Sequence, residues 1–152
     1  IKINRKNVAN HSSDVSAVMT VTGSFATVPH SWVDELVGKS DALAAKFNGD
    51  YDTFLTQSSG KVKANGSSLS IWEEYVAGTD PSDPDSIFKV TEVTFENGVL
   101  KVSWEPDLGE DRKYTEYGAK VLGSAESWVD MSTVPDEEKS DYPFRRVSVG
   151  MP

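Results

Sequence analysis

The chain has 152 residues, of which 38% are hydrophobic and 26% charged, enough apolar material for one medium domain or two small ones with a packed core. Its net charge of −9 disfavours binding to nucleic acid or to anionic membrane surfaces, and no apolar run reaches the roughly 18 residues that cross a bilayer. The absence of cysteine excludes disulfides, thiolate nucleophiles and cysteine metal sites.

The N-terminal region divides into a polar lead-in and a strand. Residues 1–14 are polar and without pattern, and we expect them to be flexible. Because the sequence opens on Ile1 and not on Met, we interpret it as a piece of a longer protein. Residues 16–28 alternate apolar and hydroxyl side chains, which predicts a strand that joins a sheet or covers its edge. Deleting residues 1–28 should therefore lower the melting temperature.

Short amphipathic helices are predicted between residues 30 and 78. Three polar residues are suited to cap the earlier ones: Ser31, Ser40 and Asp50. The clearest helix begins at Ser70, which forms an S-x-x-E capping box with Glu73, and it ends at Gly78. We therefore assign residues 15–86 to an N-terminal strand followed by short helices.

Residues 87–152 show the period-two pattern of β-strands. Asn97-Gly98 is a strong hairpin signal between two such runs. Further strands are predicted at three places: 114–123, 127–131 and 142–151. The predicted fold class is α+β, in which a small helical subdomain packs on an antiparallel β-sheet or sandwich built from 87–152.

Two resemblances follow from these residues. The run WEEYVAGTDPSDPDSIF at 72–88 resembles the tail of the thrombospondin type 3-like and dockerin-like segments of secreted bacterial proteins. Residues 87–152, with NG, VSW and a final FRRVSV strand, resemble the fibronectin type III-like β-module that follows such segments. Together they imply a non-catalytic accessory domain of a larger exported bacterial protein, outside the cell or at its surface. Its role would be spacing, attachment or binding.

Calcium is the cofactor that the first resemblance raises. In that family an aspartate-rich loop before the helix binds calcium, but counting back from Glu74 as the last ligand places Lys63 at the first ligand position, where a carboxylate is needed. The remaining candidate ligands are three loop acids: Asp80, Asp83 and Asp85. These acids are equally suited to cap turns next to proline, so a calcium-stabilised structural module is one alternative and no cofactor is the other.

A carbohydrate-binding module is a further alternative. Trp72 and Trp104 share faces with apolar residues and are expected in the core. The candidates for a sugar-stacking platform are the aromatic residues near loop ends: Trp128, Tyr114 and Tyr142. The partners we expect are the rest of the parent polypeptide and either a glycan or another surface protein.

Catalytic patterns are weak in this sequence. His30 stands beside Ser31, but Ser31 is suited to cap a helix and no orienting acid is apparent. Acidic residues cluster in loops, where they are usually solvated. We therefore expect no enzyme activity and assign no catalytic residue.

Overall fold

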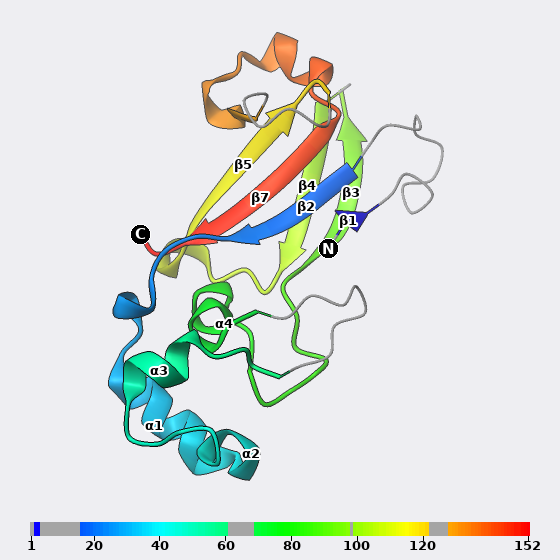
Figure 1. Cartoon of the computed structure of the whole chain (residues 1–152). Helices are drawn as coiled ribbons and strands as arrows, with labels where there is room; N and C mark the ends of the chain where they lie inside the picture. Colours follow the sequence, from blue (N-terminus) through cyan, green and yellow to red (C-terminus); the bar gives the residue numbers. More distant parts are fainter. Residues whose placement is uncertain (1, 4–15, 61–68, 98, 122–127) are drawn as a thin grey trace.

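The structure is a computed structural model that describes residues 2–3, 16–60, 69–97, 99–121 and 128–152. Short helices gather at one end of the molecule and strands form the rest (Figure 1), which confirms the α+β class. Apart from Lys2 and Ile3, the predicted flexible lead-in lies outside the described residues. None of the helices in the described ranges is long and apolar enough to cross a membrane.

The larger of two sheets has five strands in the order β1-β2-β7-β5-β6. Their bounds are Lys2–Ile3 for β1, Ser16–Val21 for β2, Phe144–Gly150 for β7, Lys113–Ala119 for β5 and Val129–Asp130 for β6. The predicted N-terminal strand thus does join a sheet, but it ends at Val21 and not at Val28, because the chain forms a 3-10 helix at Phe25–Thr27. It pairs in parallel with β7, so the expectation of a purely antiparallel sheet was wrong for this pair. Parallel neighbours need a long connection, and here all of the chain between β2 and β7 provides it.

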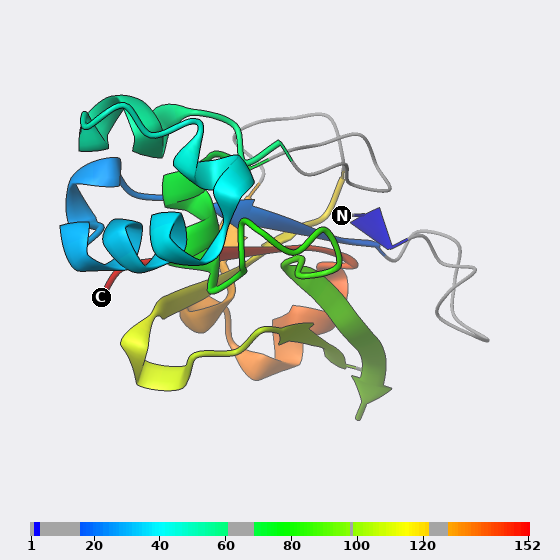
Figure 2. The same cartoon turned by 90° about the horizontal axis from the view of Figure 1, so that it is seen from below.

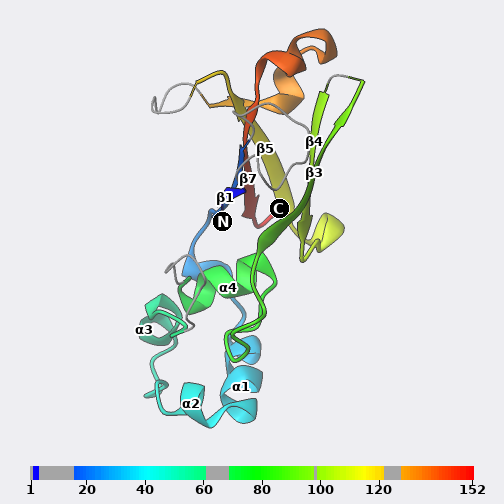
Figure 3. The ribbon, with the colours of Figure 1, turned by 90° about the vertical axis from the view of Figure 1, so that its right-hand side faces the viewer.

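The second sheet is the hairpin of β3 (Lys89–Glu96) and β4 (Val99–Glu105), paired antiparallel as the Asn97-Gly98 signal predicted. Asn97 has a φ of 51°, the left-handed conformation that such turns need. The hairpin lies behind the larger sheet as a second layer (Figures 2 and 3). A core cluster joins the two layers: Val90, Val93, Leu100, Val102 and Val147.

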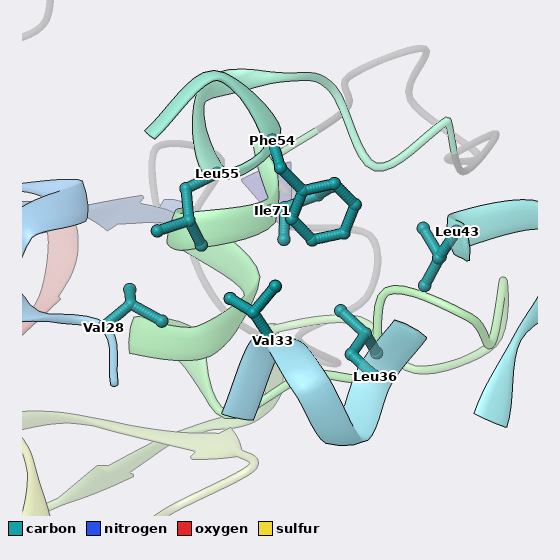
Figure 4. Close-up of a cluster of buried hydrophobic side chains, with 7 residues drawn as sticks. All are labelled: Val28, Val33, Leu36, Leu43, Phe54, Leu55 and Ile71. Carbon is teal, nitrogen blue, oxygen red and sulfur yellow. The ribbon is translucent and has the colours of Figure 1, made fainter. Parts of the chain in front are cut away.

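Four α-helices form the helical part: α1 (His30–Lys39), α2 (Asp41–Ala44), α3 (Tyr51–Thr56) and α4 (Ile71–Ala77). Seven buried side chains make their shared core (Figure 4): Val28, Val33, Leu36, Leu43, Phe54, Leu55 and Ile71. Four short 3-10 helices complete the described elements: η2 (Phe25–Thr27), η3 (Gly109–Asp111), η5 (Met131–Thr133) and η6 (Asp136–Asp141).

Most of the predicted helix caps are confirmed. Ser40 and Asp50 accept hydrogen bonds from backbone amides of α2 and α3, and Ser70 forms the capping box with Glu73 at the start of α4. Ser31 was wrong as a cap, because α1 begins at His30 with Pro29 in the cap position, two residues earlier than Ser31 would place it. Proline suits a helix start because the amide it lacks would have no intrahelical partner there.

The helical and β parts pack together at the end of α4, as expected. Val76 and Ala77 of α4 share a cluster with Phe88 and with Val149 of β7. Arg112 donates from Nε to the carbonyl of Val76 at 2.8 Å and from Nη2 to the carbonyl of Tyr75 at 2.9 Å. The guanidinium therefore donates to two of the last carbonyls of the helix, of which that of Tyr75 also accepts from the amide of Gly78.

Candidate functional site

The outer face of the larger sheet, the face turned away from the β3–β4 hairpin, is the candidate site. Side chains alternate between the two faces of a strand. On β7, Val147 and Val149 are buried in the core clusters, so Arg146 and Ser148 lie on the outer face. No described helix or strand covers this face, which is turned toward the viewer in Figure 1.

The strand register places the outer-face residues in rows. Tyr117 of β5 is opposite Arg146, and Thr115 is opposite Ser148. On the other side of β7, Thr20 is opposite Ser148, and the two hydroxyls are 2.8 Å apart. The outer face therefore presents an aromatic–arginine row followed by a row of hydroxyl groups.

Two separate hollows adjoin β5, with volumes of about 390 Å³ and about 510 Å³. The larger one is a groove on the outer face. Hydroxyl side chains contribute much of its lining: Thr22, Ser24, Thr27, Thr115 and Ser148. Lys113 and Tyr117 also line it, as does Gly150. A Cβ at Gly150 would lie 2.7 Å from Oγ1 of Thr22, so a side chain there would force Thr22 to move.

Arg146 contacts two aromatic rings beside this groove. Its guanidinium carbon is 4.8 Å from the ring centroid of Tyr117 and 5.0 Å from that of Trp128. Its Nε is buried without a hydrogen-bond partner. We call Tyr117, Trp128 and Arg146 the Arg146 cluster. Cation–π contacts hold the guanidinium without using its N–H groups, and the partial exposure of Arg146 leaves part of the group open to a ligand.

The three predicted platform residues do not lie together. Trp128 belongs to the Arg146 cluster on the outer face. Tyr142 lies on the opposite side of β5, because its Cβ is 3.0 Å from where a Cβ of Gly118 would stand, and Gly118 points the other way from Tyr117. Lys120 Nζ is 5.2 Å from the ring centroid of Tyr142.

Tyr114 also faces inward and supports the fold. Its ring centroid is 5.1 Å from that of Trp104. Its hydroxyl accepts a hydrogen bond from the amide of Leu108 at 2.9 Å and donates one to the carbonyl of Pro106 at 3.3 Å. Trp104, like Trp72, packs against the core clusters, as the sequence predicted. Tyr114 therefore stabilises the loop after β4 and does not belong to the outer face.

Sequence reasoning missed two members of the Arg146 cluster, Tyr117 and Arg146. A signal for Arg146 was present, because consecutive arginines in a strand must point to opposite faces. Arg145 takes the inner face and is only 2% exposed. Which of the two would face outward depends on the sheet, since the doublet is symmetric in sequence.

The smaller hollow, about 390 Å³, lies along the part of β5 that the short strand β6 leaves unpaired. Its lining includes Glu116, Asp130 and Lys139. Asp130 accepts hydrogen bonds from both the amide and the hydroxyl of Ser132, and these lower the pKa of its carboxyl. A carboxylate held in this way caps η5 and is poorly suited to act as a general acid.

The aspartates of the 72–88 segment form turns. Asp80 Oδ1 accepts from the amide and hydroxyl of Ser82, at 2.8 and 2.6 Å, and its Oδ2 accepts from Nζ of Lys39 at 2.9 Å. Asp83 Oδ1 accepts from the amide of Asp85 at 2.9 Å. Within the described ranges, no three acidic or histidine side chains are grouped so that they could hold a metal ion. Asp80 and Asp83 thus cap turns, which was one of the two alternatives, while calcium binding itself stays a prediction.

Glu74, the acid counted above as the last calcium ligand, accepts hydrogen bonds from within the protein. Glu74 is fully buried, and its carboxylate accepts hydrogen bonds from the hydroxyls of Ser59 and Thr79. Lys63, which occupies the first ligand position in that count, lies outside the described residues. Glu74 therefore connects α4 to the segments on either side of it.

We expect Asp80→Asn to lower stability at neutral pH by less than about 1 kcal/mol, since the Lys39–Asp80 pair is largely exposed. Partial burial raises the pKa of Asp80, but hydrogen bonds from Ser82 and Lys39 outweigh it and lower the pKa from 3.8 to about 2. Because the folded-state pKa is depressed, the stabilisation is present above 3.8 and is lost as the pH falls through about 2.

Urea unfolding of wild type and Asp80→Asn at several pH values checks this. The difference between their unfolding free energies should shrink toward zero in acid, and a difference that is constant across pH would contradict the assignment. Asp83→Asn is the matched control, because the only hydrogen bond that the Asp83 carboxylate accepts from the described residues comes from the amide of Asp85.

His30 has a packing role at the start of α1. Its ring stacks on Tyr51, with centroids 3.9 Å apart and planes 4° from parallel. The hydroxyl of Tyr51 donates to Asp34 at 2.9 Å, which raises the pKa of that tyrosine. The neighbouring Ser31 is exposed, so the pair is explained by helix packing.

Comparison with protein-family models, with curated proteins and with solved structures finds no significant match to this chain. The resemblances of residues 72–88 and 87–152 to secreted bacterial modules therefore remain predictions from the motifs themselves.

Proposed function

We propose that this chain is a non-catalytic accessory domain of a larger exported bacterial protein, and that it binds carbohydrate across the outer face of its larger sheet. The observation that carries the proposal is the Arg146 cluster beside a groove rich in hydroxyl groups, on a face that no described element covers. The proposal places the chain outside the cell or at the cell surface, in keeping with the motif at 72–88.

Sugar rings suit this surface for two physical reasons. Their C–H faces stack on aromatic side chains, and Tyr117 and Trp128 provide such rings. Their hydroxyl groups donate and accept hydrogen bonds, which the hydroxyls of Thr115 and its neighbours in the groove can reciprocate. An apolar partner protein would leave those hydroxyl groups unpaired.

Binding without catalysis is favoured by the composition of the groove. Hydrolysis of a glycosidic bond ordinarily requires two carboxyl groups flanking the bond. The residues known to line the outer-face groove include no aspartate or glutamate. We therefore propose a role in attachment or targeting for the parent protein.

We also propose that the β part is a fibronectin-like sandwich. The support is its two layers, the β3–β4 hairpin and the larger sheet, which share one core around Val147. The parallel pairing of β2 with β7 differs from the fibronectin type III fold, because sandwiches of that class are built from antiparallel sheets.

The functional proposal predicts that a panel of oligosaccharides contains ligands whose affinity depends on Trp128. Trp128→Ala should weaken binding by about three- to tenfold, the range expected for loss of one aromatic contact. Isothermal calorimetry on the best ligands of a glycan array measures the change.

The matched control is Phe95→Ala, which removes a 39% exposed aromatic residue from the hairpin. It should leave affinity unchanged. Equal weakening by both variants, or no binding to any saccharide in the panel, would contradict the proposal.

A further inference from the structure

We infer that the ligand of the outer face is an acidic polysaccharide, a sugar chain whose uronic acid carboxylates bind Arg146. This inference rests on the proposed carbohydrate function and adds the chemical class of the sugar. It follows from the charges of the outer face and from the geometry of the Arg146 cluster.

Arg146 differs from the other arginines in the described ranges. Arg112 donates to the carbonyls of Tyr75 and Val76, and Arg145 donates to Glu116 and to three carbonyls. Arg146 makes cation–π contacts, but its buried Nε has no hydrogen-bond partner and no carboxylate of the described chain pairs with it. The Arg146 residue as a whole is only partly buried, so its unpaired positive charge is left for a ligand to neutralise.

The charge of this face is opposite to that of the whole chain. The net charge is −9, yet the outer face carries Arg146 on β7 and the exposed Lys113 on β5, neither of which forms an ion pair with a carboxylate in the described ranges. Asp130 belongs to the same face, because it is opposite Tyr117 in the register, but its carboxylate already accepts hydrogen bonds from the amide and hydroxyl of Ser132. The surface is therefore complementary to an anion.

The two cations are spaced for an extended ligand. Lys113 lies four residues along β5 from Tyr117, the partner of Arg146 in the register, which corresponds to about 13 Å along the strand. The groove hydroxyls of Thr115 and Ser148 lie between them. One polysaccharide chain can thus place a carboxylate at each end and neutral hydroxyls in the middle.

An arginine held by cation–π contacts favours a carboxylate as its ligand. Its planar guanidinium presents paired N–H groups that match the two oxygens of a carboxylate, and its weak hydration lowers the cost of burying the pair. Tyr117 and Trp128 limit the rotation of the guanidinium, which reduces the entropy lost on binding. An acidic peptide fits less well, because extended peptides bind through exposed backbone edges and this face presents side chains.

The test uses three oligouronates, from pectin, alginate and hyaluronan, each compared with its neutral methyl ester by calorimetry. At least one oligouronate should bind about tenfold or more tightly than its ester, the gain expected for a charge-assisted hydrogen-bonded pair. Arg146→Gln should abolish this preference, so that the variant binds acid and ester equally, and an unchanged circular dichroism spectrum shows that the variant is folded.

The matched control is Lys101→Gln, which removes the same charge from the hairpin, where Lys101 pairs with Glu96. It should keep the preference for the acid. Equal affinity for acids and esters, or a preference that Lys101→Gln also removes, would overturn the inference and leave the carbohydrate proposal standing. Polyglutamate binding as tightly as the best oligouronate would overturn the sugar class. Failure of every saccharide would overturn the proposed function itself.

Discussion

Deletion of residues 1–23 is expected to unfold most molecules at ambient temperature. The deletion removes β2, which pairs with all but the last residue of β7, together with the partly buried side chains of Met19 and Val21 that pack on the core. Loss of the six backbone pairs and of these contacts acts against a total stability of only about 5–15 kcal/mol. The truncation ends before Val28, so the helical core keeps all of its members.

The control is deletion of residues 1–15, which leaves β2 in place and removes β1, whose register with β2 comprises two pairs. Chemical denaturation followed by circular dichroism compares both truncations with the full chain. The shorter deletion should shift the midpoint little and the longer one should abolish the transition. Equal midpoints for the two would show that β2 is dispensable to the sheet.

Arg145→Met is expected to lower the free energy of unfolding by about 3 kcal/mol, the low end of what breaking a buried charge pair costs. Arg145 is 2% exposed, and its guanidinium donates to Glu116 at 2.6 Å and to the carbonyl of Leu100 at 3.3 Å. It also donates to carbonyls of Lys139 and Tyr142. One side chain thereby connects the hairpin, β5 and the segment around η6, and methionine fills the space without satisfying these acceptors.

The adjacent arginine provides the comparison. Arg146→Met removes the same group from the outer face, where it makes no hydrogen bond to the described protein, and should change stability by less than about 1 kcal/mol. Thermal and urea unfolding of the two variants measure the difference. Similar destabilisation by both would contradict the opposite facing of the two residues.

Local signals in the sequence predicted the features that depend on neighbouring residues. Helix α4 starts at the capping box of Ser70 and Glu73 and ends at the left-handed Gly78, a few residues further along the chain. The Asn97-Gly98 signal likewise predicted the pairing of β3 with β4. Such features can be predicted because their stabilising contacts are made within one turn of chain.

Contacts between segments that are distant in the sequence could not be predicted from local signals. Thr20 and Ser148, whose hydroxyls meet on the outer face, are 128 residues apart. The hairpin covers one face of the larger sheet. Which face it covers decides that the side chain of Tyr114 points inward and that Arg146, and not Arg145, points outward. Trp128 was identified as a candidate from its place near a loop, but its neighbours Tyr117 and Arg146 come from other strands. An aromatic residue indicates a binding surface only when its cross-strand neighbours are known.

NMR titration can locate the bound ligand on the outer face through the backbone amides. Titration with the best oligosaccharide of the panel should shift the amides of Thr115, Tyr117, Arg146 and Ser148 on the outer face. It should leave the hairpin, residues 89–105, unchanged. Shifts concentrated in the hairpin or in the helices, with β5 and β7 unaffected, would contradict the assignment of the outer face as the binding surface.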